Sequence, residues 1–396
     1  MSISLAIRAT RSRGPARRLW RAAWLISYVL QMPARIALLL AAVARHGVFI
    51  LSSDTWVHRR LDLPLLRLLR KRIILVFTGS DHRPPYLDGW FGARESTPAW
   101  SDLARATRRV RQRVATAERY ADEIVALPAS AHFHTKPIID FLRVGIPFAL
   151  PATSDAAAAP GPFRGEGVRV LHSPSNPVGK GSDLVRAAIE QLRAAGHAID
   201  YVEIAGRPHS EVLAALRDCD FVVDEVFSDT PMASFATEAA TFGKPAVVTG
   251  YYAELIADEL PPEAIPPSLF EMPDKLTAAI ERLLVDEPFR LALGARAQAF
   301  VSKKWNPVTV AGRYLRIIDA EVPDDWRWDP ARQRYLYGWG MHRELVASTV
   351  RGLVASAGPT VLQLSHNPAV DTRLRDLASA AHGDRPPTSA VISRDG

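Results

Sequence analysis

The sequence predicts an α/β protein whose two main domains are each built on a mostly parallel sheet covered by helices. Three observations support this prediction. Short runs of aliphatic and β-branched residues alternate with stretches of helical periodicity along most of the chain. The connections between successive runs are long enough for right-handed crossovers. A stretch rich in Ala, Pro and Gly, residues 149–167, separates two such series and is typical of a linker.

Composition excludes several classes of protein. The chain has 396 residues, of which 48% are apolar and 23% are charged, which is ordinary for a globular protein of two or three domains. A largely disordered, collagen-like or polytopic membrane protein is therefore excluded. Cys219 is the one cysteine, so no intrachain disulfide and no cysteine-based zinc site can form, which fits a reducing, cytoplasmic compartment.

The net charge of +7 arises at the N-terminus. The first 53 residues contain eight arginines and no acidic residue, which leaves 41 basic against 42 acidic residues in the rest of the chain. Proteins that bind nucleic acid usually carry positive charge over the folded body. We therefore expect no nucleic-acid partner.

The basic leader, residues 1–34, alternates arginines with apolar blocks. Its longest uncharged run, 22–34, has 13 residues and is too short to span a bilayer. One interpretation is that residues 8–30 lie on an anionic membrane surface. The other is that the arginines form a solvated end of the first domain. A helix at 36–45 is expected to belong to the core in either case.

The first series of elements, residues 35–150, predicts an N-terminal domain. Strand, helix and strand alternate, and the strands read as buried β-branched runs, which favours a parallel sheet. In chain order we expect a strand at 48–52, a helix at 61–72, a strand at 72–77, a helix at 105–120 and a strand at 123–127 with a turn at 128–130.

The second series, residues 168–320 after a linker at 151–167, repeats the alternation and predicts a doubly wound domain. Strands are expected at 168–172, 201–205, 221–226 and 246–249, helices at 182–195, 210–217, 232–242 and 253–259, and closing helices at 273–285, 288–303 and 307–321. Residues 321–396 predict an extension with a Trp- and Tyr-rich patch, a helix near 341–356 and a disordered end.

Ligands of open α/β sheets bind beyond the carboxyl ends of the strands, and three loops there carry candidate residues. In the first, glycines flank Lys180, whose ammonium suits phosphate oxygens, and Ser182 or Asp183 could cap the next helix. The spacing is not that of a Walker A loop. The lysine could equally be solvated. The second loop is Gly206–Arg207, which could frame a base or form a plain turn.

The third loop, residues 228–235, predicts a helix start at Asp229 or Thr230 because a proline follows. Unpaired N–H groups at such a start suit a diphosphate. Two turns on, Glu238 lies in an apolar stretch, where burial is costly without partners. Ribose hydroxyls would be suitable partners, and an ion pair or a surface position is the alternative.

In the first domain, Asp81, His82 and Arg83 follow a predicted strand. They could orient an acceptor or stabilise developing charge, or they could form a capped turn. His132 and His134 follow the strand at 123–127 and receive less weight. Cys219 lies within an Asp-x-Asp sequence that enters a strand, which is the wrong end of the sheet for a catalytic metal.

The segment 168–318 resembles the nucleotide-sugar-binding domain of GT-B glycosyltransferases of the family-four type. The resemblance rests on the Lys180–Gly181 loop, on the Glu-Ala-x-x-x-Gly-Lys-Pro sequence beginning at Glu238, and on the pattern at 274–286 with its trailing helices. Residues 62–66 and 79–83 are similar to the acceptor domain of one branch. The chain departs from the family at Thr230, where a paired acid eight residues before Glu238 is usual.

The resemblance implies a GT-B architecture, two Rossmann-like doubly wound domains facing a cleft, with a shortened first domain. It implies transfer from a nucleotide diphosphate sugar to a glycan or lipid-linked envelope acceptor, commonly with retention and without a metal or other cofactor. The catalytic candidates are Asp81, His82 and Arg83. The donor-binding candidates are Lys180, Gly181, Gly206, Arg207, Thr230, Ser234, Phe235 and Glu238.

Two alternatives stay open. A nucleotide-sugar epimerase shares the two-domain architecture and would act without an acceptor. A non-catalytic binding protein of the same fold is favoured by Thr230 in place of the paired acid and by the short first domain.

Overall fold

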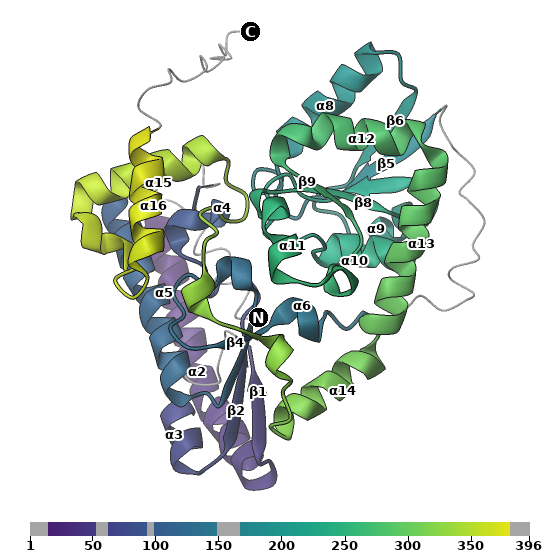
Figure 1. Ribbon diagram of the computed structural model, residues 1–396. Coiled ribbons are helices and arrows are strands. Elements are labelled where there is room, and N and C mark those ends of the chain that lie inside the picture. Colours follow the sequence, from purple (N-terminus) through teal and green to yellow (C-terminus); the bar gives the residue numbers. More distant parts are fainter. Residues whose placement is uncertain (1–14, 53–61, 93–98, 149–166, 381–396) are drawn as a thin grey trace. The chain divides into compact units, whose positions relative to one another are not determined.

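The computed structural model describes residues 15–52, 62–92, 99–148 and 167–380 (Figure 1). Residues 151–166 of the predicted linker at 151–167, and residues 1–14 of the leader predicted at 1–34, lie outside the described residues. The chain forms two compact units, one of residues 1–77 with 117–124 and the other of residues 78–116 with 125–396. The domain boundaries expected from the sequence stay predictions.

The first unit contains α2 (Pro15–Arg45), β1 (Val48–Leu51), α3 (Asp62–Leu68) and β2 (Arg72–Val76). Strands β1 and β2 pair in parallel, as their buried aliphatic runs predicted. Asp122 joins this unit by accepting a hydrogen bond from the Ile73 N–H (2.8 Å) and an ion pair from Arg67 (2.6 Å).

The expectation of a core helix at 36–45 is wrong. Helix α2 continues through Pro33, and in its second half Leu39 is buried while Ile36, Leu38 and Leu40 are exposed by 45%, 64% and 57%. A helix that packs by one side buries only that side, and Leu39 marks it here. The apolar residues away from Leu39 are left exposed on the surface of the helix.

Helix α5 (Trp100–Tyr120) begins in the second unit, and its last residues belong to the first. Strand β3 (Glu123–Ala126) ends in the second unit, where it pairs in parallel with β4 (Ile138–Asp140). A two-residue strand, β10 (Arg327–Trp328), pairs antiparallel with β4. The sequence did not predict β4 or β10, because runs of two or three residues carry too little periodicity.

The second sheet is five-stranded and parallel, with the order β6-β5-β7-β8-β9. This topology confirms the predicted parallel α/β class. The strands are β5 (Val168–His172), β6 (Ile199–Glu203), β7 (Phe221–Val223), β8 (Ala246–Thr249) and β9 (Leu269–Glu271). The helices are α8 (Ser182–Ala194), α9 (His209–Asp218), α10 (Ser234–Thr241), α11 (Ile256–Glu259), α12 (Leu276–Val285), α13 (Glu287–Lys304) and α14 (Pro307–Ile318).

Two hydrophobic clusters cover the two faces of this sheet. Side chains alternate between faces along a strand, so Val170 joins one cluster with α8 and α12 residues, and Leu171 joins the other with residues of α10 and α13. Strands β5, β7 and β8 are buried over most of their residues and read as apolar runs, which explains why the sequence located them. The sequence did not predict β9, because three residues carry too little periodicity.

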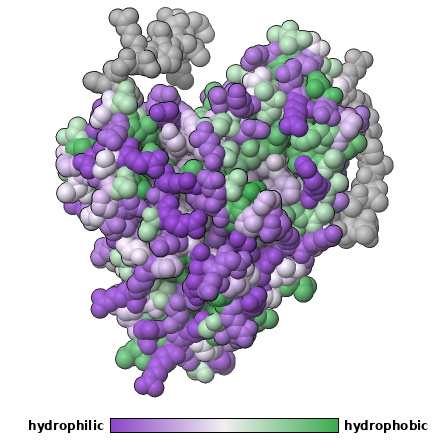
Figure 2. Space-filling model, viewed as in Figure 1, coloured by the Kyte–Doolittle hydropathy of each residue, from purple (hydrophilic) through white to green (hydrophobic). Residues whose placement is uncertain are grey.

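A third cluster unites the C-terminal helices with the early part of the second unit. Helices α15 (Arg343–Ala357) and α16 (Pro368–Ala380) bury Val350 and Leu374 beside Tyr86 and Val114. The prediction of a disordered end is therefore wrong for residues 368–380, and residues 381–396 lie outside the described residues. On the face shown in Figure 2, apolar side chains lie in groups interrupted by hydrophilic ones.

Candidate functional site

The Lys180 loop connects β5 to α8. Gly181 adopts a left-handed conformation (φ 70°) at the N-cap of α8, which a side chain would strain. The prediction that Ser182 or Asp183 caps this helix is wrong, because no side chain caps it. The Ser182 hydroxyl instead contacts Nε2 of His172 (2.8 Å), and this buried contact fixes the loop to the end of β5.

Lys180 is buried and ion-paired with two acids that follow β7. Its ammonium contacts the Asp224 carboxylate and lies 3.3 Å from Glu225 Oε1. Burial alone would favour the neutral amine, but the two carboxylates outweigh it and raise the pKa of Lys180. The ammonium also lies 5.9 Å from the centre of the Phe235 ring on α10. The lysine is therefore a fixed cation.

Asp224 links this cation to a helix start. Its second carboxylate oxygen accepts the Ala236 N–H of α10 (3.1 Å). Helix α10 begins at Ser234 with Ala233 as its N-cap, so the predicted helix start at Asp229 or Thr230 is wrong. The Thr230 N–H and carbonyl bond the Ser228 hydroxyl instead, and form a local turn.

Glu238 lies one turn beyond Phe235 on α10. Its carboxylate pairs with Nε2 of His209, the first residue of α9, at 3.0 Å. Glu238 thus has a side-chain partner, as in the ion-pair alternative that the sequence left open, and the contact is an ion pair when His209 is protonated. Arg207 forms an exposed ion pair with Glu211 (2.9 Å), and Gly206 adopts φ 67° with open space around it. The Gly206–Arg207 loop follows β6, and the loop at 228–235 follows β7.

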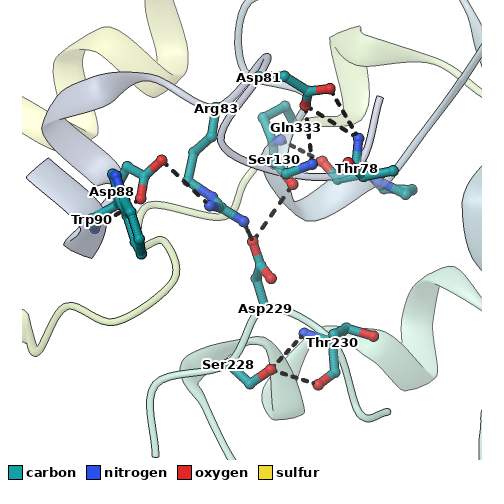
Figure 3. Close-up of polar contacts among 12 residues, drawn as sticks. Thr78, Asp81, Arg83, Asp88, Trp90, Ser130, Ser228, Asp229, Thr230 and Gln333 are labelled. Atoms are coloured by element: carbon teal, nitrogen blue, oxygen red, sulfur yellow. Dashed lines mark hydrogen bonds and ion pairs between the residues drawn. The ribbon is translucent and has the colours of Figure 1, made fainter. Parts of the chain in front are cut away.

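Arg83 forms the second buried ion pair (Figure 3). Its guanidinium contacts Asp229 and lies 3.7 Å from Asp88 Oδ2. Burial opposes its charge, but the two carboxylates prevail and raise the pKa of Arg83. Asp229 also lies 3.5 Å from the Ser130 hydroxyl. The sequence had identified Arg83 but not its partners.

Asp81 and His82 have structural contacts in this conformation. The Asp81 carboxylate accepts the N–H groups of Thr78 and Gly79, each at 3.1 Å, which is the capped-turn alternative. His82 is fully buried, and its Nδ1 lies 3.2 Å from Nε2 of His134. Burial first, and then the neighbouring His134, hold the pKa of His82 well below its usual value. A neutral imidazole at this place can donate one hydrogen bond and accept another.

A C-terminal strap, defined here as residues 333–341, crosses these loops. The Trp339 carbonyl accepts the Gly89 N–H and the Gly340 N–H donates to the Phe227 carbonyl, both at 2.8 Å. The Trp339 indole packs on Gly179, next to Lys180, where a Cβ would overlap the ring. The strap therefore joins the Arg83 loop to the Lys180 loop.

Aromatic side chains of the strap pack against aromatic residues of the neighbouring loops. Tyr337 stacks near Tyr251 with ring centres 4.2 Å apart, and Phe227 lies beyond it at 6.1 Å from Tyr251. The Tyr335 carbonyl accepts a hydrogen bond from His132 Nε2 (2.8 Å). The sequence had noted a Trp- and Tyr-rich patch here without a role, and its position beside the candidate loops could not be read from spacing.

Two absences concern the described part of the chain alone. Within residues 15–52, 62–92, 99–148 and 167–380, no three His, Cys, Asp or Glu side chains are arranged to hold a metal ion. None of the helices described is long and apolar enough to cross a bilayer. The acids adjoining Cys219 precede β7, as expected, and both bond Arg169.

No protein-family model and no curated protein matches this chain. Among solved structures, it is similar to HepE from Anabaena in complex with UDP and glucose (TM-score 0.44, 13% identity, 73% of this chain and 81% of that chain). It is also similar to sucrose-phosphate synthase from Thermosynechococcus elongatus (0.41, 14%, 74% and 80%) and to WaaG, a glycosyltransferase involved in lipopolysaccharide biosynthesis (0.40, 14%, 72% and 95%). These proteins are GT-B glycosyltransferases, the class that the sequence resembles. At such identities and TM-scores the likeness assigns no activity to this chain.

Proposed function

We propose that this protein is a glycosyltransferase that moves a sugar, of the hexose type, from a nucleotide diphosphate sugar to a glycan or lipid-linked acceptor. One observation carries the proposal: a fixed cation, an aromatic ring and a carboxylate follow one another beyond the ends of β5 and β7. The Lys180 ammonium faces the Phe235 ring, and Glu238 follows one helical turn later. These groups suit a diphosphate, a flat or apolar ligand surface and ribose hydroxyls, respectively.

The donor would exchange contacts at Lys180. Glu225 is the more distant of its two carboxylates, whereas Asp224 bonds both Lys180 and the Ala236 N–H. Diphosphate oxygens would therefore replace Glu225 at the ammonium while Asp224 keeps the lysine aligned with α10. Ser234, the first residue of α10, would supply a backbone N–H group, Gly181 would let the backbone approach the ligand closely, and Thr230, Gly206 and Arg207 would complete the donor site.

On the acceptor side, we propose Arg83 as the residue that stabilises developing charge, with His82 and Asp81 orienting the acceptor. The ion pair with Asp229 supports this choice, because it fixes the Arg83 guanidinium beside Thr230, a proposed donor-site residue. Transfer would be metal-independent, because fixed cations and helix N–H groups take the place of a metal. We also propose that it is retaining, as the resemblance to the family-four type implies. We place the enzyme in the cytoplasm, on the inner face of the membrane.

Calorimetric titration of the full chain with UDP, GDP, ADP, dTDP and UDP-glucose tests donor binding. We expect at least one to bind, Lys180→Met to weaken it about ten- to hundredfold through the lost charge-assisted bonds, and Glu238→Gln to weaken it less. Lys303→Met, the same change at an exposed lysine on α13, should bind like the parent. Absence of binding by all five, or equal binding by Lys180→Met with unchanged thermal stability, would refute the proposal.

A non-catalytic nucleotide-binding protein is the second candidate. The observation that favours it is that Lys180 and Arg83 each face two carboxylates, so neither cation has uncompensated charge. Incubation of the nucleotide-sugar complex with a membrane extract separates the candidates, when the products are analysed by mass spectrometry after a chromatographic step that resolves epimers of equal mass. Release of free nucleotide with a glycosylated product supports the transferase, and recovery of the intact donor supports the binding protein. Recovery of an epimerised donor would refute both.

A further inference from the structure

One face of α2 is apolar and exposed from Ile26 to Ala44. Helical geometry, at 100° per residue, places five exposed aliphatic side chains within an arc of about 120°. They are Ile26, Val29, Leu30, Ile36 and Leu40, exposed by 59%, 58%, 75%, 45% and 57%. Pro33, Ala37 and Ala44 lie on the same face and are exposed too. The face runs from residue 26 to residue 44, about 27 Å along the helix.

The described charges of α2 lie off this face. Arg35 and Arg45 are rotated away from the centre of the apolar arc by about 160° and 120°, and buried Leu39 marks the side that packs. A soluble surface rarely leaves so long an apolar stripe without polar interruption. The face therefore requires an occupant.

Charge selects the occupant. Up to residue 53 the chain contains eight arginines and no acid, so a second copy of α2 would bring like charges together without a compensating carboxylate. An anionic bilayer offers both an apolar layer for the face and negative headgroups for the arginines. Since no described helix can cross a bilayer, the helix would lie along it.

We propose that the α2 face, defined as Ile26, Val29, Leu30, Pro33, Ile36, Ala37 and Leu40, lies in the interface of an anionic membrane with the helix axis parallel to the surface. The attached segment is then shifted along the chain relative to the sequence expectation of residues 8–30 and includes the helix half that had been expected in the core. This attachment is independent of the proposed donor chemistry, because none of these residues belongs to the candidate site.

Sedimentation of the full chain with phosphatidylcholine vesicles, with and without phosphatidylglycerol, tests the proposal. We expect binding to the anionic vesicles that decreases as salt is raised. Leu30→Glu and Leu40→Glu should each lower the partition coefficient about tenfold or more, because a charge replaces a leucine that the bilayer would bury. Val308→Glu, the same kind of change at an apolar residue of α14 that is 82% exposed, should bind like the parent.

A fluorescent label gives a second measurement that does not depend on losing binding. Because Cys219 is buried, an environment-sensitive dye can be attached selectively to Leu30→Cys or Val308→Cys. We expect a blue shift on anionic vesicles for the first and none for the second. Failure of the parent to bind, equal binding by the glutamate variants, or an unshifted Leu30→Cys dye would overturn the proposal. A dimer that the same variants dissociate, detected by light scattering, would overturn it in favour of a second copy.

Discussion

Removal of the charge of Asp229 should destabilise the second unit strongly. Both partners of the Arg83–Asp229 pair have side chains only 5% exposed, and loss of one partner of such a pair leaves a buried charge, at a cost of about 3–5 kcal/mol. Asp88, 3.7 Å from the guanidinium, compensates in part. We therefore expect Asp229→Asn to cost about 3 kcal/mol.

Differential scanning calorimetry measures this loss. In a large folding unit, 1 kcal/mol corresponds to about 2 °C or less in melting temperature, so Asp229→Asn should melt about 5 °C lower. Asp258→Asn is the matched control, because its pair with Arg334 is exposed on both sides and should be worth at most about 1 kcal/mol.

A double-mutant cycle separates pairing from other effects of the substitution. With Arg83→Met present, Asp229 has no arginine partner to leave unpaired. Adding Asp229→Asn should then cost at least about 2 kcal/mol less than it does in the parent. A shift for Asp229→Asn no larger than that of Asp258→Asn, or strictly additive effects in the double variant, would refute the reasoning.

Three further outcomes are expected. Burial lowers the pKa of His132 to about 4, so the unfolded chain binds a proton before the native state does. The free energy of unfolding should therefore fall by about 3 kcal/mol as the pH drops from 6.5 to 4. His132→Gln, which can still donate to the Tyr335 carbonyl, should reduce this pH dependence in urea-unfolding measurements, and an unchanged dependence would contradict the reasoning. Burial raises the pKa of Asp140 to about 7, so the native state binds the proton first; Asp140→Asn, which keeps the acceptor for the Leu142 N–H, should gain stability over the parent as pH rises from 4 to 7, measured by the same titration. Burial raises the pKa of the Cys219 thiol to about 12, so maleimide should label it in urea but not in the native protein, and rapid native labelling followed by mass spectrometry would disprove its burial.

The sequence located the elements whose burial is uniform. Strands β7 and β8 are buried at every position, and β5 is buried over its last three residues. Such largely apolar runs carry their own signal. Strand β10 has two residues and depends on pairing with β4, about 190 positions earlier. Helix α16 looks polar in isolation, and only its packing against the third cluster makes it a folded element.

The sequence selected Lys180 and Glu238 as candidate residues but did not identify the residues that they contact. Lys180 and Glu238 could be selected because each is an unusual charge in its context. Their counter-ions could not, since Asp224 lies 44 residues from Lys180 and His209 lies 29 residues from Glu238. Those pairs depend on the register of β5 with β7 and on the approach of α9 to α10. The acids Asp224 and Glu225, directly after a buried strand, were the available signal.

The third hydrophobic cluster has a consequence for synthesis on the ribosome. Tyr86, Leu103 and Val114 acquire their buried contacts from helices that begin at Arg343 and Pro368. Chains emerge from the N-terminus at a limited rate, so these side chains stay uncovered until nearly the whole polypeptide has been made. The nascent chain consequently exposes apolar surface, of the kind that chaperones bind, over most of its translation. A premature stop after α14 would leave a product with exposed apolar residues, a form that cellular proteases remove.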